Sequence, residues 1–110
     1  MEQTIMQSSM QLIFYAGNAR SLAMQAIMAA EQKKMPQAQE YLEQAKEELK
    51  NSHQIQTDFM QAELNGTEIE KSIILIHSQD HFMAASLCCD MAERFIIMYE
   101  QFQRLEEKCL

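Results

Sequence analysis

The chain has 110 residues, a length that fits one domain over 1–110, and it contains only two glycines and one proline. This shortage of turn-forming residues argues against a β-sandwich, a barrel or a Gly-rich nucleotide-binding fold, and it favours long helices. The formal net charge of −7 disfavours binding to nucleic acid or to an anionic membrane and favours basic partners.

Turn signals at two places divide the chain into three predicted helices. Around 33–36, two lysines close one helical pattern, and Pro36 can open the next helix at its first position. Asn65-Gly66 is a typical helix-stop pair, and the segment 67–70 that follows has the spacing of a capping box. The expected helices are 3–33, 36–64 and 70–107.

The first two predicted helices each carry one narrow apolar stripe. Steps of three, four or seven residues define it, and most of its members are small, so a neighbouring helix can approach closely. In the second helix the stripe becomes polar toward its end. The expected core positions are Ile5, Leu12, Ala16, Ala19, Ala23, Ala26 and Ala30, then Ala38, Tyr41, Ala45, Leu49, Ser52, Gln56, Phe59 and Glu63.

The third predicted helix is apolar on more than one face, which three helices of one chain cannot cover. We therefore predict an all-α, antiparallel three-helix bundle that assembles into an oligomer with this helix near the symmetry axis; a plain three-helix monomer is the alternative. The apolar residues are Ile73, Ile74, Leu75, Ile76, Phe82, Met83, Leu87, Met91, Phe95, Ile97, Met98, Phe102 and Leu105.

Asp80 interrupts an apolar seam of this helix that runs through Ile73, Ile76, Met83 and Leu87 with gaps of three and four residues. A buried lone carboxylate must be protonated, paired or bound to a metal. If the helix lines a three-fold axis, three copies of Asp80 converge and can coordinate a divalent cation. Alternatively, Asp80 is an interior side chain bonded to a histidine.

His77 and His81 lie one turn apart on the same helix face, and Asp80 is three residues from His77. A neutral imidazole can accept a phosphoryl or acyl group, so His77 is a candidate nucleophile. Alternatively, His77 is partly buried and helps to satisfy Asp80. A zinc site is disfavoured because the pair lacks the glutamate of an H-E-x-x-H motif. The third histidine, His53, is expected to be solvated or to lie between helices.

Three motifs together resemble the lactose/cellobiose-type enzyme IIA components of the bacterial phosphoenolpyruvate-dependent sugar phosphotransferase system. The resemblance covers roughly residues 5 to 102. Its motifs are Ala16-Gly17-Asn18-Ala19-Arg20-Ser21, His53-x-x-Gln56-Thr57 and His77-x-Gln79-Asp80-His81-x-Met83.

This resemblance implies a homotrimer in which His77 receives a phosphoryl group from the phosphocarrier HPr and passes it to a cysteine of the cognate IIB component. The sugar, a β-glucoside or β-galactoside disaccharide, is then phosphorylated as it crosses the membrane through IIC. The resemblance also implies that three copies of Asp80 hold one divalent cation per trimer, commonly magnesium. This axial position of Asp80 agrees with its place in the apolar seam of the third helix.

The segment 72–93 contains no lysine or arginine, so the motif itself offers no cationic clamp. His81, Gln79, Ser78 or a neighbouring subunit must then hold the phosphoryl group, and Gln79 can instead orient the His77 ring.

The cysteines Cys88, Cys89 and Cys109 form no C-x-x-C pair, which favours a reducing, cytoplasmic location. No apolar stretch is long enough to span a membrane, and we expect no membrane insertion.

A non-enzymatic acidic helical adaptor, or a chaperone-like interaction module, is the main alternative function. It explains the ten methionines, since Met-rich faces bind partner helices. It does not explain four polar motif residues inside an apolar helix. A metal-storage bundle would need carboxylates from several helices facing one point.

Overall fold

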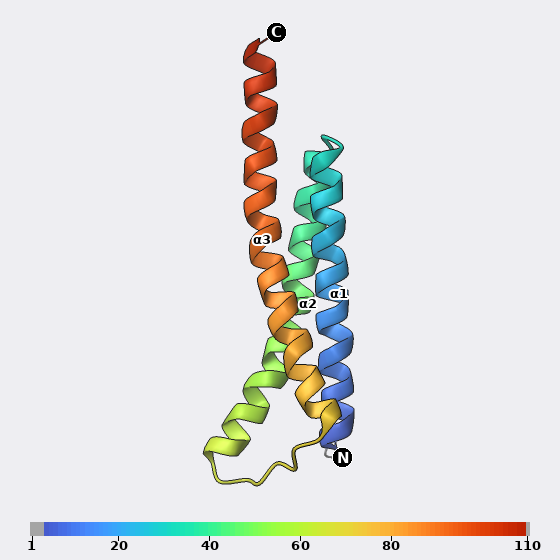
Figure 1. Ribbon diagram of the computed structural model, residues 1–110, viewed down its shortest axis with the longest axis vertical. Coiled ribbons are helices and arrows are strands. Elements are labelled where there is room, and N and C mark those ends of the chain that lie inside the picture. Colours follow the sequence, from blue (N-terminus) through green and yellow to red (C-terminus); the bar gives the residue numbers. More distant parts are fainter. Residues whose placement is uncertain (1–3, 110) are drawn as a thin grey trace.

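Three helices make up the computed structural model, which describes residues 4–109 (Figure 1). They are α1 (Ile5–Glu31), α2 (Met35–Leu64) and α3 (Ile73–Cys109). Successive helices run in opposite directions and form a rod of 63 × 21 × 21 Å. The predicted all-α three-helix fold is confirmed. The predicted boundaries agree within three residues, although the expected start at residue 3 lies outside the described part.

The helix ends differ from the prediction in two places. A capping box opens α1, where the Gln7 amide donates to the Thr4 hydroxyl (3.1 Å) and the Thr4 amide donates to the Gln7 side chain (3.0 Å). The capping box expected at 67–70 is wrong, because α3 begins only at Ile73, where Ser72 Oγ accepts from the Leu75 amide (3.2 Å). The chain needs the segment 65–72 to cross the end of the bundle between α2 and α3 (Figure 1).

The two connections use backbone conformations that stop a helix. Lys33 has a φ of 63° in the tight turn after α1, and Gly66 has a φ of 89° directly after α2. Glycine reaches that region without a steric penalty, so the predicted stop at Asn65-Gly66 is confirmed. Pro36 is the second residue of α2 rather than the first, where its missing amide is equally harmless.

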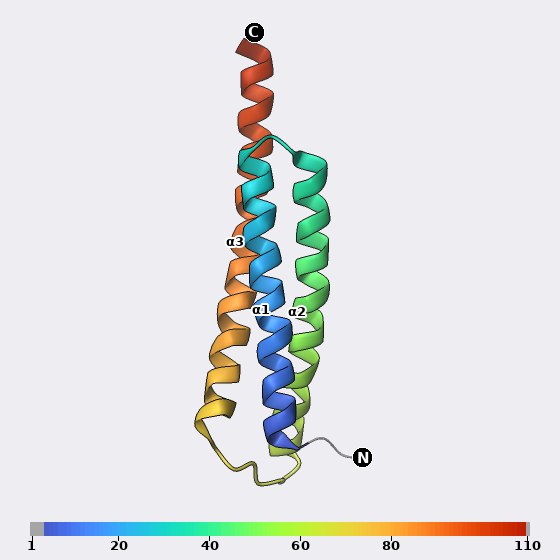
Figure 2. The same cartoon turned by 90° about the vertical axis from the view of Figure 1, so that its right-hand side faces the viewer.

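Small side chains along α1 form the centre of the core. The predicted stripe from Leu12 to Ala30 is buried as expected, and Ser9 and Ala29 join it; Ile5 is only half-buried. Alanines on this stripe let α2 and α3 lie close on either side of α1 (Figure 2). In α2 the buried residues are Ala38, Leu42, Ala45 and Ser52. Leu42 was missed, and the predicted core position Glu63 is exposed.

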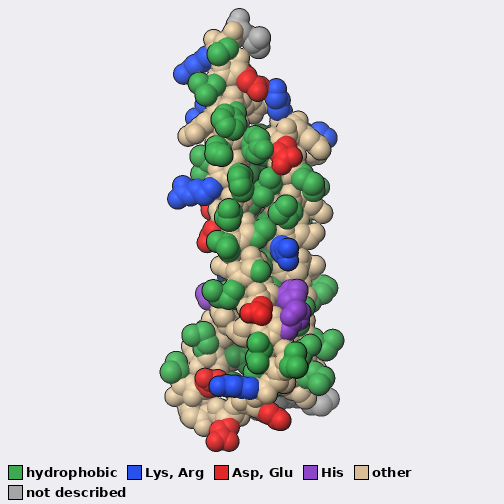
Figure 3. All heavy atoms as spheres, viewed as in Figure 1, with side chains coloured by type: hydrophobic (Ala, Val, Ile, Leu, Met, Phe, Trp, Pro, Cys, Tyr) green, Lys and Arg blue, Asp and Glu red, His purple; other side chains and the backbone are tan. Residues whose placement is uncertain are grey.

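Helix α3 has two apolar faces, and only one of them packs against α1 and α2. We call the buried side the inner face of α3; its members are Leu75, Ser78, Phe82, Ala85, Cys89, Ala92 and Ile96. We call the exposed seam the outer face of α3; its apolar members are Ile73, Ile76, Met83, Leu87, Met91, Phe95, Met98, Phe102 and Leu105. Hydrophobic side chains consequently line the surface over much of the rod (Figure 3).

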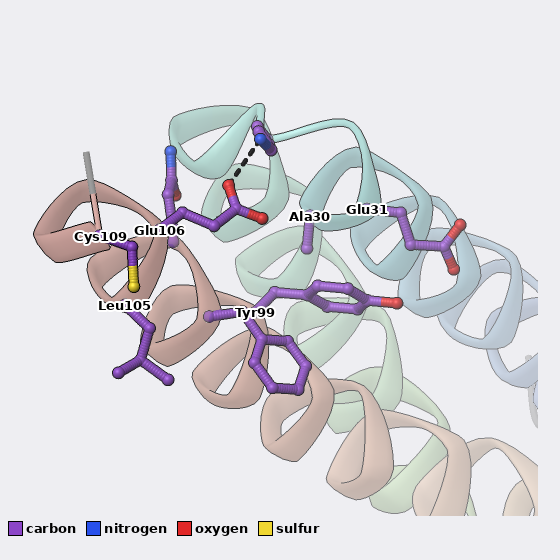
Figure 4. Close-up of a pocket in the computed structure, with 9 residues that line it drawn as sticks. Ala30, Glu31, Tyr99, Leu105, Glu106 and Cys109 are labelled. Carbon is purple, nitrogen blue, oxygen red and sulfur yellow. Dashed lines mark hydrogen bonds and ion pairs between the residues drawn. The ribbon is translucent and has the colours of Figure 1, made fainter.

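The C-terminal end of α3 projects beyond the α1–α2 turn (Figures 1 and 2). Three polar contacts join this half of α3 to the rest of the chain: Lys46–Glu93 (3.1 Å), Gln39–Glu100 (2.8 Å) and Lys33–Glu106 (2.6 Å). Beside the last pair, Tyr99 and Leu105 line a hollow of about 450 Å³ next to the end of α1 (Figure 4). The two ion pairs, Lys33–Glu106 and Lys46–Glu93, are solvent-exposed, so each contributes little to stability.

Candidate functional site

His77 and His81 meet on the surface one turn into α3. Their Nε2 atoms are 3.1 Å apart, and the two rings cross at 79° with centroids 4.5 Å apart. His77 is exposed and His81 is half-buried. The predicted pairing on one face is therefore confirmed, whereas the alternative that His77 is partly buried is wrong. The histidines lie in the lower half of the molecule among exposed hydrophobic side chains (Figure 3).

A chain of polar side chains on another side of the same turn fixes α3 against α2. The buried Ser78 hydroxyl donates to the Leu75 carbonyl (2.5 Å), and Gln79 Nε2 donates to Ser78 Oγ (3.4 Å). Gln79 Oε1 accepts from Gln56 Nε2 (3.0 Å). Both polar atoms of Gln79 thus have partners other than His77. The structure brings Gln79 to Gln56, a contact that the sequence analysis did not foresee.

Asp80 lies on the outer face of α3 and is exposed. Within residues 4–109 its carboxylate has no hydrogen bond or ion pair. The alternative that Asp80 is an interior side chain bonded to a histidine is therefore wrong. The seam residues on either side, Ile76 and Met83, are also exposed. The pattern of gaps is real, but it lies on the surface of the single chain. No group of three or more His, Cys, Asp or Glu side chains in the described part could hold a metal ion.

His53 lies on α2 and stacks on Phe82, with ring centroids 5.3 Å apart and an angle of 21°. It is exposed and bridges two helices, as expected. Phe82 belongs to the inner face of α3, so this stack joins α2 to the core. The only ring contact of His53 in the described part is with Phe82. The His77–His81 pair is formed within α3 alone.

Lys71 is a cation that the sequence analysis missed. It lines a cavity of about 220 Å³ together with Ile76 and Gln79, between the end of α2 and the start of α3. The residue stands one position before the cation-free segment 72–93, and the course of the loop places it in one cavity with Gln79; neither His77 nor His81 lines that cavity. The spacing of Lys71 from Gln79 in sequence carried no signal of this.

None of the described helices combines the length and the apolar character that crossing a bilayer requires.

Comparison with known proteins gives a consistent result. The family profile described as "PTS system, Lactose/Cellobiose specific IIA subunit" matches residues 7–100. The lichenan-specific phosphotransferase enzyme IIA component of Bacillus subtilis is 39% identical over 101 residues, which are 92% of each chain.

Two solved structures share the fold. The cellobiose-specific enzyme IIA from Bacillus anthracis has a TM-score of 0.89 and 41% identity, covering 94% of this chain and 95% of that one. The IIA(chitobiose)–HPr complex of Escherichia coli has a TM-score of 0.80 and 26% identity, covering 93% and 99%.

Proposed function

The chain belongs to the lactose/cellobiose-specific IIA subunit family of the sugar phosphotransferase system, whose members act as phosphoryl carriers, and we propose that His77 is the residue that carries the phosphoryl group. The observation that supports this most is the exposed His77 ring with its Nε2 held 3.1 Å from His81 Nε2. An imidazole that a protein donor can reach, oriented by a second group, is what nucleophilic phosphoryl transfer needs.

In the proposed transfer, Nε2 of His77 attacks the phosphorus of the donor's phosphohistidine. A nitrogen–phosphorus bond forms at His77, the donor's nitrogen–phosphorus bond breaks, and the donor nitrogen keeps the electron pair. Before the attack, the Nε2–H of His81 donates a hydrogen bond to the Nε2 lone pair of His77; this bond breaks as the lone pair turns to phosphorus, and the same N–H then donates to a phosphoryl oxygen. The His77 ring releases its Nδ1 proton to water as it takes the phosphoryl group, and the freed donor ring takes up a proton. Gln79 supports the site through Gln56 and Ser78, which hold this turn of α3 in place.

We propose that the donor is HPr and that the acceptor is a cysteine of the cognate IIB component. The structural relative solved as a complex with HPr supports the first partner. The net charge of −7 attracts a basic partner face.

We also propose a homotrimer with the outer face of α3 on the three-fold axis. Exposed side chains such as Ile73 (85%) and Leu87 (61%) make this face too apolar for a monomer in water. Asp80, which has no partner within residues 4–109, then meets two further copies. Three carboxylates fit one hard divalent cation such as Mg²⁺, whose charge would offset their repulsion.

The cognate sugar in this proposal is a β-glucoside or β-galactoside disaccharide, taken up by a IIC component. The naming of relatives for lichenan, cellobiose and chitobiose supports the β-glucoside, and that of a lactose-specific EIIA component supports the β-galactoside. A cytoplasmic location follows from the exchange with HPr, and the three free cysteines agree with it.

The decisive experiment is transfer from phosphoenolpyruvate through enzyme I and HPr to the purified chain. Wild type should gain the mass of one phosphoryl group, in an acid-labile and base-stable linkage. His77→Gln should gain none, whereas His53→Gln, the same change at the histidine outside the pair, should gain it normally. Full acceptance by His77→Gln would refute the assignment, and no acceptance by wild type would favour the adaptor.

A further inference from the structure

The histidine pair has the dimensions of a metal chelate. Zn²⁺ binds imidazole nitrogen at about 2.0–2.1 Å, so two such nitrogens in neighbouring coordination positions lie about 3 Å apart. The Nε2 atoms of His77 and His81 are 3.1 Å apart. Because the helix places both side chains one turn apart on the same face, the two rings can reach one ion.

We propose that His77 and His81 form a two-ligand site for a borderline divalent transition-metal ion, represented by Zn²⁺. The two side chains can both turn toward an ion, since His77 is exposed and His81 is half-buried. Imidazole nitrogen is a preferred ligand of such ions, whereas Mg²⁺ prefers oxygen. The site therefore differs in chemistry from the three carboxylates proposed on the trimer axis.

No lysine or arginine in the segment 72–93 opposes a cation at this site. Asp80, which stands between the two histidines in sequence, is assigned to the axial cation and supplies no ligand here. No third His, Cys, Asp or Glu side chain of the described part completes a closed site. Water fills the remaining positions, so the ion binds reversibly. The pair lacks the glutamate of hydrolytic zinc motifs, and the ion has no hydrolytic role.

Occupancy of this site would block phosphoryl transfer, a consequence that rests on the proposed function of His77. The lone pair on Nε2 that binds the ion is the same lone pair that would attack phosphorus. Metal and phosphoryl group are therefore mutually exclusive on His77. A free transition-metal ion would act as a reversible inhibitor of the carrier.

Calorimetric titration with ZnCl₂ tests the site on the full chain, with excess Mg²⁺ to occupy oxygen sites and with Cys109→Ser to remove the exposed thiol. We expect one Zn²⁺ per subunit. Loss of an outer partner of a metal ligand alone weakens binding about 10–100-fold, so His77→Gln or His81→Gln should weaken it by at least about tenfold. His53→Gln is the matched control and should bind Zn²⁺ like wild type.

A second measurement needs no variant. Cu²⁺ added to wild type should give an electron paramagnetic resonance spectrum with coupling to two imidazole nitrogens. Unchanged Zn²⁺ affinity in His81→Gln, no Zn²⁺ binding at all, or coupling to a single nitrogen would overturn the proposal. Phosphoryl acceptance in metal-free buffer is measured separately, so a failed zinc site leaves the carrier function intact, and the reverse also holds.

Discussion

The inner and outer faces of α3 come from the same 37 residues but do different work. The inner face consists of small or well-packed residues buried against α1 and α2, such as Ala85 and Ile96. The outer face is more apolar than a surface should be, and it also carries Asp80, with His77 beside it. The inner face of α3 thus folds the chain, and the rest of its surface is left for the proposed assembly and the proposed phosphoryl transfer.

The largest expected effect is on assembly. Leu87→Asp should convert the proposed trimer to single chains, because three additional carboxylates would be buried together at the axis. Light scattering coupled to size-exclusion chromatography measures the mass. Gln44→Asp, an equal change of charge on the exposed side of α2, should leave it unchanged. A trimeric Leu87→Asp variant would show that the outer face is not the interface.

A smaller side chain on the inner face should lower stability instead. Ile96 is 1% exposed, and Ile96→Ala should lower the free energy of unfolding by about 2–5 kcal/mol through lost burial and the cavity left behind. Urea unfolding at several protein concentrations measures this cost, which should not depend on concentration. Met98 on the outer face is exposed, so any cost of Met98→Ala should come from assembly and shrink on dilution. The same dependence on protein concentration in both variants would contradict the distinction between the two faces.

Asp80→Leu should preserve or strengthen the trimer, since it replaces three converging carboxylates with apolar side chains that continue the seam. The same change should remove the axial cation. Metal analysis of the purified trimer, with Asp90→Leu as a control for loss of an exposed carboxylate on α3, checks both expectations. An Asp80→Leu trimer that retains its metal would contradict the axial site.

The smallest expected effect concerns Cys89 on the inner face. Burial, followed by the neighbouring Cys88 and Asp90, raises the pKa of the Cys89 thiol from 9.0 to about 11. A folded-state pKa above the unfolded value gives stability that is present below pH 9 and is lost as the pH rises toward 11. The unfolding free energy of wild type should therefore fall more steeply over that range than that of Cys89→Ala. Parallel slopes in the two proteins would show that Cys89 does not contribute.

Local chemistry made much of this architecture predictable. The alanine stripe of α1 and the positions of His77 and His81 one turn apart follow from the period of a helix. The helix stop at 65–66 follows from the freedom of glycine to adopt a positive φ. The first residue of α3 could not be predicted in this way. The segment 67–70 has the spacing of a capping box, but the chain needs these residues to cross the end of the bundle. Lys71 reaches the motif through the same loop.

Side-chain order thus specifies three helices, their approximate limits and a polar cluster inside an apolar helix, since these depend on neighbours within one or two turns. Which of the two apolar faces of α3 turns inward depended on packing against α1 and α2. The seam through Asp80 could have been buried or exposed with the same pattern of gaps. Only the arrangement in space places Asp80 at the surface and pairs Gln79 with Gln56, because both outcomes depend on how separate helices pack, which no local period encodes.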